Sequence, residues 1–257
     1  MVANDYEVAD PKQVFRGLTY GQWIGVWYNN LMSDKPDIAY REGKNMAFLR
    51  GNVEFSYAQQ EDPKNKVFTA MTNEQGITIQ EDTAVLIPVI STMVVLGDDY
   101  QGQDMNDELS LRAAARRDTI NGGPIGVQIK KLPNGSLSKL LSVGELDDYY
   151  VETPLFPLTV SKASSIRKTI EIPIEAGPYQ AVVAGIFVII YNLTVGKYRL
   201  GFYGRGIGRY TTRSVYDIEV KPGKEKLRDI SDPRSGRIQG EDNPMSFIKD
   251  FMKENEI

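Results

Sequence analysis

Residues 179–220, YQAVVAGIFVIIYNLTVGKYRLGFYGRGIGRYTTRSVYDIEV, decide the fold. They contain three apolar segments, Tyr179–Tyr191, Val195–Tyr203 and Tyr210–Val220, which are separated by short runs that include Asn or Gly. Val, Ile, Tyr and Phe favour extended backbone, whereas Asn and Gly favour turns. Strands at this regular spacing are typical of a β-sandwich or a β-barrel.

Similar segments occur upstream of this stretch. We expect further strands at Met46–Arg50, Val53–Tyr57, Val67–Met71, Ile77–Gln80, Thr83–Leu96, Val151–Val160 and Ile166–Ile174. Pro88, inside the long Val- and Ile-rich segment Thr83–Leu96, indicates a bulge, a bend or an edge position. Strands do not alternate repeatedly with helices, which argues against a parallel sheet. The sequence predicts a mainly β fold, either an antiparallel β-sandwich or a jelly roll, and an immunoglobulin-like strand order stays open.

Two helices and a hairpin interrupt this pattern. Thr19 and Gln22 fit a capping box, and an aromatic and apolar face follows at helical spacing: Tyr20, Trp23, Ile24, Trp27, Tyr28 and Leu31. Asp104–Ile120 predicts a helical insertion, which the sequence Asn-Gly-Gly-Pro at 121–124 ends. The Asn134-Gly135 pair predicts a hairpin between Ile125–Leu132 and Leu137–Val143.

The two ends of the chain differ from this body, which we expect to form one domain over residues 19–220. Residues 1–18 are polar and aperiodic and predict an extended N-terminal arm. Residues 221–243 predict a polar linker, and Asn243-Pro244 begins a short amphipathic helix over 244–257. Its apolar face consists of Phe247, Ile248, Phe251 and Met252. Such a helix behind a polar linker is typical of a docking element for another subunit.

The composition excludes many common kinds of active site. The 257 residues include no cysteine and no histidine, which rules out thiolate sites, Cys nucleophiles and Ser-His-Asp triads and removes the usual zinc ligand. The formal net charge of −4 offers no field for a phosphate backbone. We therefore expect no cofactor, no metal, no nucleic acid and no enzymatic activity. Residues Met1–Asp5 carry no basic or apolar run, so we expect no export signal, no membrane partner and a location in the cytoplasm or in a virion.

Several segments together resemble a family of uncharacterised, mostly exported bacterial proteins with a β-sandwich-like C-terminal half. They are Tyr20-Gly21-x-Trp23-x-x-x-Trp27, Leu86–Ile90, and the segments Tyr179–Gly185, Phe187–Ile190 and Gly196–Gly204. The resemblance covers roughly residues 19–220 and implies a fold, because the family has no established catalytic residues to carry over. This chain departs from it by lacking an export signal and cysteines.

The glycine-rich run Gly204–Gly208 and the arginines around it form one candidate binding site. A phosphate-binding loop needs a helix after its glycines, whereas a strand-like segment follows here, so a hairpin loop is the favoured interpretation. Nearby lie Arg199, Arg205, Arg209 and Arg213, which suit a basic spot for an acidic partner, although a solvated loop rim is the ordinary alternative. We predict that Arg205 and Arg209 contact a partner, together with the apolar face of the C-terminal helix.

Other candidates have equally ordinary alternatives. Acidic clusters that offer oxygen ligands for calcium occur at Asp98-Asp99, Asp104, Asp107-Glu108 and Asp147-Asp148. Carboxylates for glycoside hydrolysis are available in or near strands at Glu54, Glu145, Glu152, Glu171 and Glu219. The aromatic face with Trp23 and Trp27 suits a stacking platform for sugars or bases, although such a face more often packs against a sheet.

The absence of common catalytic residue types, the β body and the two tails favour one class of function. We expect a structural or interaction protein of a larger assembly, a virion component such as a capsid, decoration or tail-associated protein, with a homo-oligomeric partner. Jelly rolls are common in capsids. The alternatives are a carbohydrate-binding β-sandwich module and, after that, a carboxylate-based enzyme that acts on glycosides.

Overall fold

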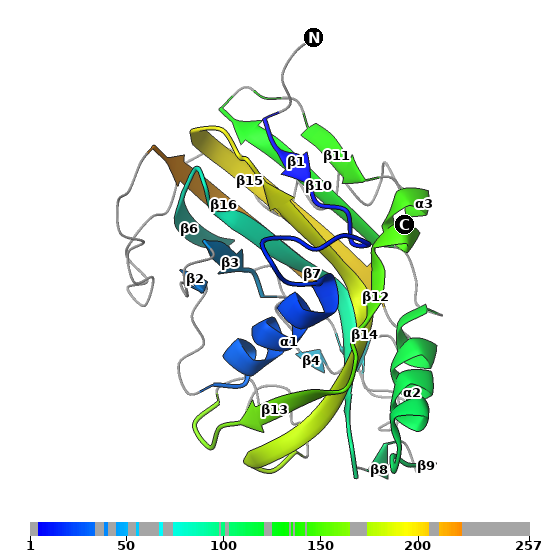
Figure 1. Cartoon of the computed structure of the whole chain (residues 1–257). Helices are drawn as coiled ribbons and strands as arrows, with labels where there is room; N and C mark the ends of the chain where they lie inside the picture. The colour runs from blue at the N-terminus through cyan, green and yellow to red at the C-terminus, as the bar shows by residue number, and fades with distance from the viewer. Residues whose placement is uncertain are drawn as a thin grey trace.

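The protein is mainly β. The computed structural model describes residues 5–33, 39–40, 45–50, 55–56, 67–68, 74–97, 99–100, 103–120, 125–133, 135, 137–141, 143–164, 174–205 and 211–222. Within these residues, a seven-stranded sheet and a five-stranded sheet form the body, and two short hairpins accompany them. Helices α1 (Tyr20–Leu31) and α2 (Glu108–Ile120) flank the larger sheet (Figure 1).

The first sheet has the order β1-β14-β7-β3-β2, and β12 and β13 also pair with β14. Its strands are β1 (Glu7–Val8), β2 (Ala39–Tyr40), β3 (Met46–Phe48), β7 (Ala84–Val95), β12 (Tyr150–Glu152), β13 (Phe156–Val160) and β14 (Gly177–Tyr191). The 15-residue β14 has β7 on one edge and three short strands, β13, β12 and β1, in succession along the other. This strand therefore organises the sheet.

The second sheet has the order β11-β10-β15-β16-β6. Its strands are β6 (Glu74–Gln80), β10 (Ile125–Leu132), β11 (Leu137–Leu141), β15 (Gly196–Arg205) and β16 (Thr211–Lys221). The remaining elements are β4 (Phe55–Ser56), β5 (Val67–Phe68), β8 (Asp99–Tyr100), β9 (Gln103–Asp104), α3 (Val143–Leu146) and the 3₁₀ turn η1 (Asp147–Tyr149). Pairing is mostly antiparallel, as expected, but β3 pairs with β7 and β6 pairs with β16 in parallel, which the sequence pattern did not indicate.

Several predicted boundaries differ from the observed ones, and two of these differences have a clear physical reason. The segment Val151–Val160 is two strands, because Thr153 interrupts the ladder: its Oγ1 accepts the Val183 N–H at 2.9 Å, and Pro154 follows. The insertion becomes helical only at Glu108, since Asp107 caps it by accepting the Ser110 N–H at 2.9 Å. Most of the strand expected at 166–174 lies outside the described residues.

The long strands β7 and β14 are buried on both faces. On one face, side chains such as Val183 and Phe187 pack under α1. On the other face, Val188 packs against the second sheet, whereas Val182 packs against α2 farther along the strand. Figure 1 shows α1 and α2 on opposite sides of the β7–β14 pair. One sheet therefore supports three different covering elements.

The aromatic face of α1 belongs to the core. Trp23 and Trp27 are 0% and 5% exposed, and their indole N–H groups donate to the carbonyl oxygens of Phe15 (2.9 Å) and Leu49 (2.8 Å). The predicted capping box of Thr19 and Gln22 is present. The interpretation of this face as core is confirmed, and these two tryptophans are not available as a stacking platform.

The segment predicted as an N-terminal arm lies along the body over residues 5–18. The Ala9 N–H donates to the Ile189 carbonyl of β14 at 2.9 Å, and the Tyr20 hydroxyl donates to the Ala9 carbonyl at 2.8 Å. Burial raises the pKa of Tyr20, so this hydroxyl stays protonated as a donor. At the start of the segment, Lys131 donates to the Asp5 carboxylate at 2.5 Å.

A bulge in β7 brings the two sheets close together. Phe187 pairs with Pro88 and Ile186 pairs with Ile90, so Val89 is the extra residue, as Pro88 led us to expect. Gly204 of β15 lies directly against this bulge. A Cβ at that position would lie 2.5 Å from the Val89 carbonyl oxygen. Only glycine permits this approach of backbone to backbone.

Replacing Gly204 with alanine should therefore destabilise the fold. The added methyl group would overlap the β7 backbone, and overpacking of this kind costs about 1–3 kcal/mol. Urea unfolding of Gly204→Ala and of the wild type measures the difference. Val195→Ala, at a position that is 46% exposed, is the control and should change stability by less than about 0.5 kcal/mol. Equal effects of the two substitutions would contradict the close approach.

Candidate functional site: an uncharged groove between α1 and β13

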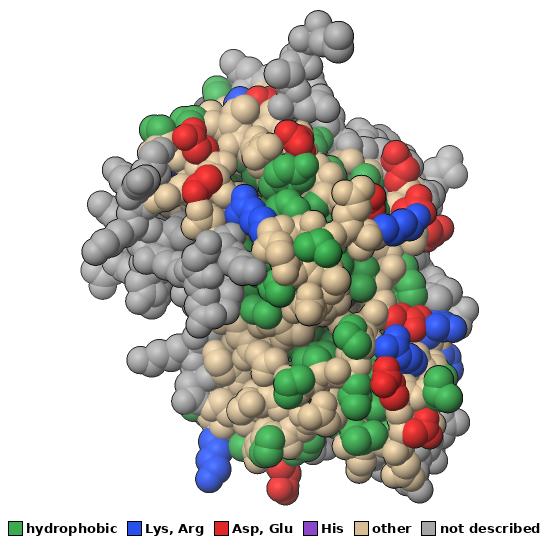
Figure 2. All heavy atoms as spheres, in the orientation of Figure 1, with side chains coloured by type: hydrophobic (Ala, Val, Ile, Leu, Met, Phe, Trp, Pro, Cys, Tyr) green, Lys and Arg blue, Asp and Glu red, His purple; other side chains and the backbone are tan. Residues whose placement is uncertain are grey.

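An uncharged surface extends over α1 and β13. The sequence of α1, YGQWIGVWYNNL, contains no charged residue, although Gln22, Val26, Asn29 and Asn30 reach the surface. The segment Thr153–Val160, which leads into and forms β13, also lacks charge. Solvent-facing helix positions usually carry charged or polar side chains, and here the polar ones are all uncharged. Figure 2 shows the charged side chains of this face lying around the surface over α1 and β13.

A groove of about 460 Å³ lies in this surface. Nine residues line it, six from α1 and three from the β12–β13 region: Gly21, Gln22, Gly25, Val26, Asn29, Asn30, Pro154, Phe156 and Pro157. None of these side chains ionises. The groove therefore offers apolar contact and amide groups and has no acid, base or cationic group of its own.

Two glycines of α1 set the depth of the groove. Gly21 and Gly25 are one helical turn apart and face the chain that enters β13. A Cβ on Gly21 would lie 3.1 Å from the Pro154 side chain, and one on Gly25 would lie 3.3 Å from the Phe156 ring. The absence of side chains lets the proline and the ring rest on the helix backbone.

Asn29 closes one end of the groove and fixes β13 to α1. Its Nδ2 donates to the Pro157 carbonyl at 2.9 Å, and its Oδ1 accepts the Thr159 N–H at 3.0 Å. The side-chain amide thus occupies the outer edge of β13 as a neighbouring strand would. Pro157 removes a further donor from that edge. An added strand is excluded at these positions, so a ligand of the groove has to bind through side chains.

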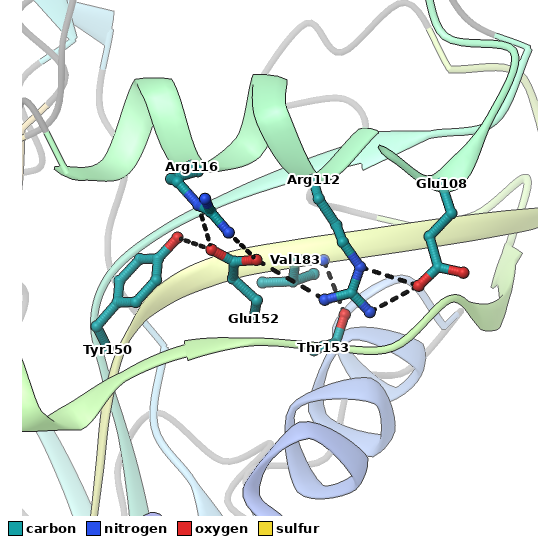
Figure 3. Close-up of polar contacts among 7 residues, drawn as sticks. All are labelled: Glu108, Arg112, Arg116, Tyr150, Glu152, Thr153 and Val183. Atoms are coloured by element: carbon teal, nitrogen blue, oxygen red, sulfur yellow. Dashed lines mark hydrogen bonds and ion pairs between the residues drawn. The ribbon is translucent and has the colours of Figure 1, made fainter. Parts of the chain in front are cut away.

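A second polar feature, the arginine–glutamate network, fixes α2 to β12 (Figure 3). Arg116 donates to both oxygens of Glu152, at 2.6 and 2.9 Å, and the Tyr150 hydroxyl donates to the same carboxylate at 2.8 Å. Arg112 lies 3.7 Å from Glu152 and donates to Glu108 one turn earlier on α2. The network spans two elements that are far apart in the sequence.

The electrostatics of this network follow from its donors. The hydrogen bond from Arg116 holds the pKa of Glu152 below its usual range, and Glu152 in turn raises the pKa of Arg116. Burial raises the pKa of Tyr150. The Glu152 carboxylate thus stays ionised and satisfied by its donors, which is the state of a structural anchor. A general acid would need the opposite shift.

Most of the predicted partner-binding residues lie outside the described residues. These are Phe247, Ile248, Phe251, Met252 and Arg209; of Arg205, only the backbone in β15 is described.

The prediction that Arg199 belongs to a basic spot on the surface is wrong. It is 4% exposed and makes a two-pronged ion pair with Asp217 on the neighbouring strand, at 2.8 and 3.0 Å. The two residues are direct cross-strand partners, which places an acid opposite the base. Arg199 is therefore not part of a surface for acidic partners.

Of the glycine-rich run, Gly204 and Arg205 end β15, and residues 206–210 lie outside the described residues. β15 and β16 pair antiparallel up to Arg205 and Thr211, so a strand and not a helix follows the glycines. This arrangement lacks the helix that the phosphate-binding alternative requires after its glycines.

The acidic clusters and strand carboxylates do not converge in the part of the chain that the structure describes. No group of three or more Asp and Glu side chains there is placed to hold a metal ion. Asp107 caps α2, Asp99 pairs with Asp104 in the β8–β9 hairpin, and Asp147 and Asp148 lie in η1. Of the candidate carboxylates, Glu54 and Glu171 lie outside the described residues, and Glu145 is exposed on α3.

The two remaining carboxylates, Glu152 and Glu219, lie on different sheets. Glu152 belongs to the arginine–glutamate network, and Glu219 accepts a hydrogen bond from Thr78 at 3.5 Å. The structure does not bring them together as a catalytic pair.

Sequence reasoning missed the groove, although a signal for it was present. Twelve helical residues without a charge, with Gly21, Gly25 and Asn29 at four-residue spacing, indicate a helix face that other groups approach closely. The matching wall, Pro154–Pro157, comes from a distant segment that was expected to be one continuous strand. Its approach to α1 depends on the tertiary fold.

No protein-family model matches the chain, and no curated protein matches it. The resemblance of residues 19–220 to exported bacterial proteins therefore stays a prediction. Neither α1 nor α2, the longest helices among the described residues, is long and apolar enough to span a membrane.

Replacing Glu152 with glutamine should destabilise the protein above pH 5. Hydrogen bonds to a charged group contribute about 1.5–3 kcal/mol when they are well satisfied, so we expect a loss near the lower value. The folded-state pKa of Glu152 lies below its ordinary value of 4.5, so its contribution is complete above that pH. The contribution is lost as the pH falls through the folded-state pKa. Urea unfolding of both proteins from pH 7 to pH 3 measures the difference.

The expected result is a stability difference that narrows towards pH 3. Glu81→Gln, at an exposed position in the turn before β7, is the matched control and should have little effect at either pH. A difference for Glu152→Gln that stays constant with pH would show that the carboxylate charge does not stabilise the fold.

Proposed function

We propose that the protein is a non-enzymatic structural or interaction protein of a larger assembly. The assembly that fits best is a virion, in which the chain would serve as a capsid, decoration or tail-associated protein with further copies of itself as partners. The uncharged groove between α1 and β13 carries this proposal. Interfaces are depleted of charged residues at their centre, as this groove is.

The arrangement of the two sheets supports the proposed body of a β-sandwich or jelly roll. Strands β7 and β14 of the first sheet share one apolar core with β10, β15, β16 and β6 of the second. A common core between two facing sheets is typical of sandwich architectures, which are widely used in capsids. The feature that departs most from a simple jelly roll is the parallel pairing of β6 with β16 and of β3 with β7.

The alternatives receive less support from the geometry. A carbohydrate-binding module would use exposed aromatic rings, whereas Trp23 and Trp27 are core residues. A glycoside-active enzyme would use two carboxyl groups about 5–10 Å apart across a cleft. The groove has no carboxyl group among its lining residues.

Truncation tests the proposal. Strand β16 ends at Lys221, so removing residues 223–257 keeps every described strand. The shortened chain should stay folded, with an unchanged circular dichroism spectrum, but should associate less than the full chain in sedimentation velocity. The reason is that the apolar face Phe247–Met252, which we propose as the docking element, is lost.

A second variant, Phe247→Ser with Phe251→Ser in the full chain, keeps the length of the tail and changes only its apolar face. It should lose association as the truncation does. A full chain that sediments as a monomer at every concentration would refute the assembly proposal. Unfolding of the truncated chain would instead assign residues 223–257 to the core.

A further inference from the structure

We propose that the apolar C-terminal segment of this chain, Pro244–Met252, is the ligand of the groove between α1 and β13. This inference rests on the proposed function, since it names the surface that the docking element would contact. A single contact would account for two features of the chain: the uncharged groove, and the short apolar segment that follows the polar linker.

The chemistry of the two surfaces matches. Phe247 and Phe251, like Ile248 and Met252, are four residues apart and would lie on one side of a helix. The charged residues Lys249 and Asp250 of the segment, and Lys253 and Glu254 directly after it, would lie on the other side, facing water. The groove offers the apolar surfaces of Val26, Phe156 and two prolines and has no charge to desolvate.

The geometry of the groove favours such an occupant over an added strand. Asn29 and Pro157 already occupy the outer edge of β13, which leaves side-chain packing as the mode of binding. Gln22 and Val26 are one turn apart on α1, so they form a ridge against which a second helix can pack. An apolar helix in an apolar groove is a recurrent mode of peptide recognition.

The linker is long enough to deliver the segment. Between the end of the described chain at Pro222 and Pro244 lie 21 residues, 223–243, whose extended length is roughly 70 Å. A body of about 220 residues has a radius of gyration of roughly 17 Å. The segment therefore reaches a groove on its own body as well as one on a neighbouring copy, and the experiment has to separate these arrangements.

A single introduced thiol in the groove reports occupancy, because the chain has no cysteine of its own. Val26→Cys is placed in the full-length chain, and its rate of alkylation by a small maleimide is measured. The same variant is then made with Phe247→Ser and Phe251→Ser in the tail. Docking predicts that these tail substitutions raise the alkylation rate roughly tenfold, the factor that corresponds to 1.4 kcal/mol of lost docking free energy.

The matched control is Val195→Cys, an exposed position in the turn between β14 and β15 that does not line the groove. Its alkylation rate should be the same with either tail. An unchanged rate at position 26, or an equal increase at position 195, would overturn the inference, because the tail would then not protect the groove specifically.

Dilution separates this inference from the proposed function. Protection of position 26 that weakens on dilution shows that the segment docks on a neighbouring copy, which supports both. Protection that is independent of concentration shows that it docks on its own body; the groove assignment then stands, and the assembly proposal loses its docking element.

Discussion

The fold depends on the burial of one strand on both faces and along both edges. Residues Gly177–Tyr191 pair with β7 on one side and with β13, β12 and β1 on the other, while α1, α2 and the second sheet cover their faces. Every backbone donor and acceptor in so buried a strand needs a partner. The short strands, the Thr153 hydroxyl and the Ala9–Ile189 hydrogen bond meet that need at successive points along one edge.

The polar groups near this strand act mainly as anchors. Asn29 ties β13 to α1, the Glu152 carboxylate ties β12 to α2, and Tyr20 ties the N-terminal segment to β14. Each anchor joins elements from distant parts of the chain. These side chains are committed to the fold, whereas the groove between α1 and β13 has a lining that is apolar and amide in character.

The sequence predicted the parts of the fold that local patterns determine. The capping box of α1, the central strand with its bulge at Pro88 and the β15–β16 hairpin follow from neighbouring residues. Features that depend on distant contacts could not be read locally. Two of these features join segments that lie more than a hundred residues apart: the pairing of β6 with β16 and the packing of Pro154 on Gly21. A third, the burial of Arg199 opposite Asp217, depends on the register of β15 and β16.

The central position of β14 has a consequence for the order in which the chain can fold as it is made. Helix α1, strand β7 and the short strands β12 and β13 all precede their common partner in the sequence. At roughly 5–20 residues per second, the ribosome takes on the order of 10–30 s to add the residues between α1 and β14. During that interval the edge of β7 that pairs with β14 has no partner, and α1 lacks the part of its apolar cover that β14 provides, so the nascent chain is exposed to premature association until β14 emerges.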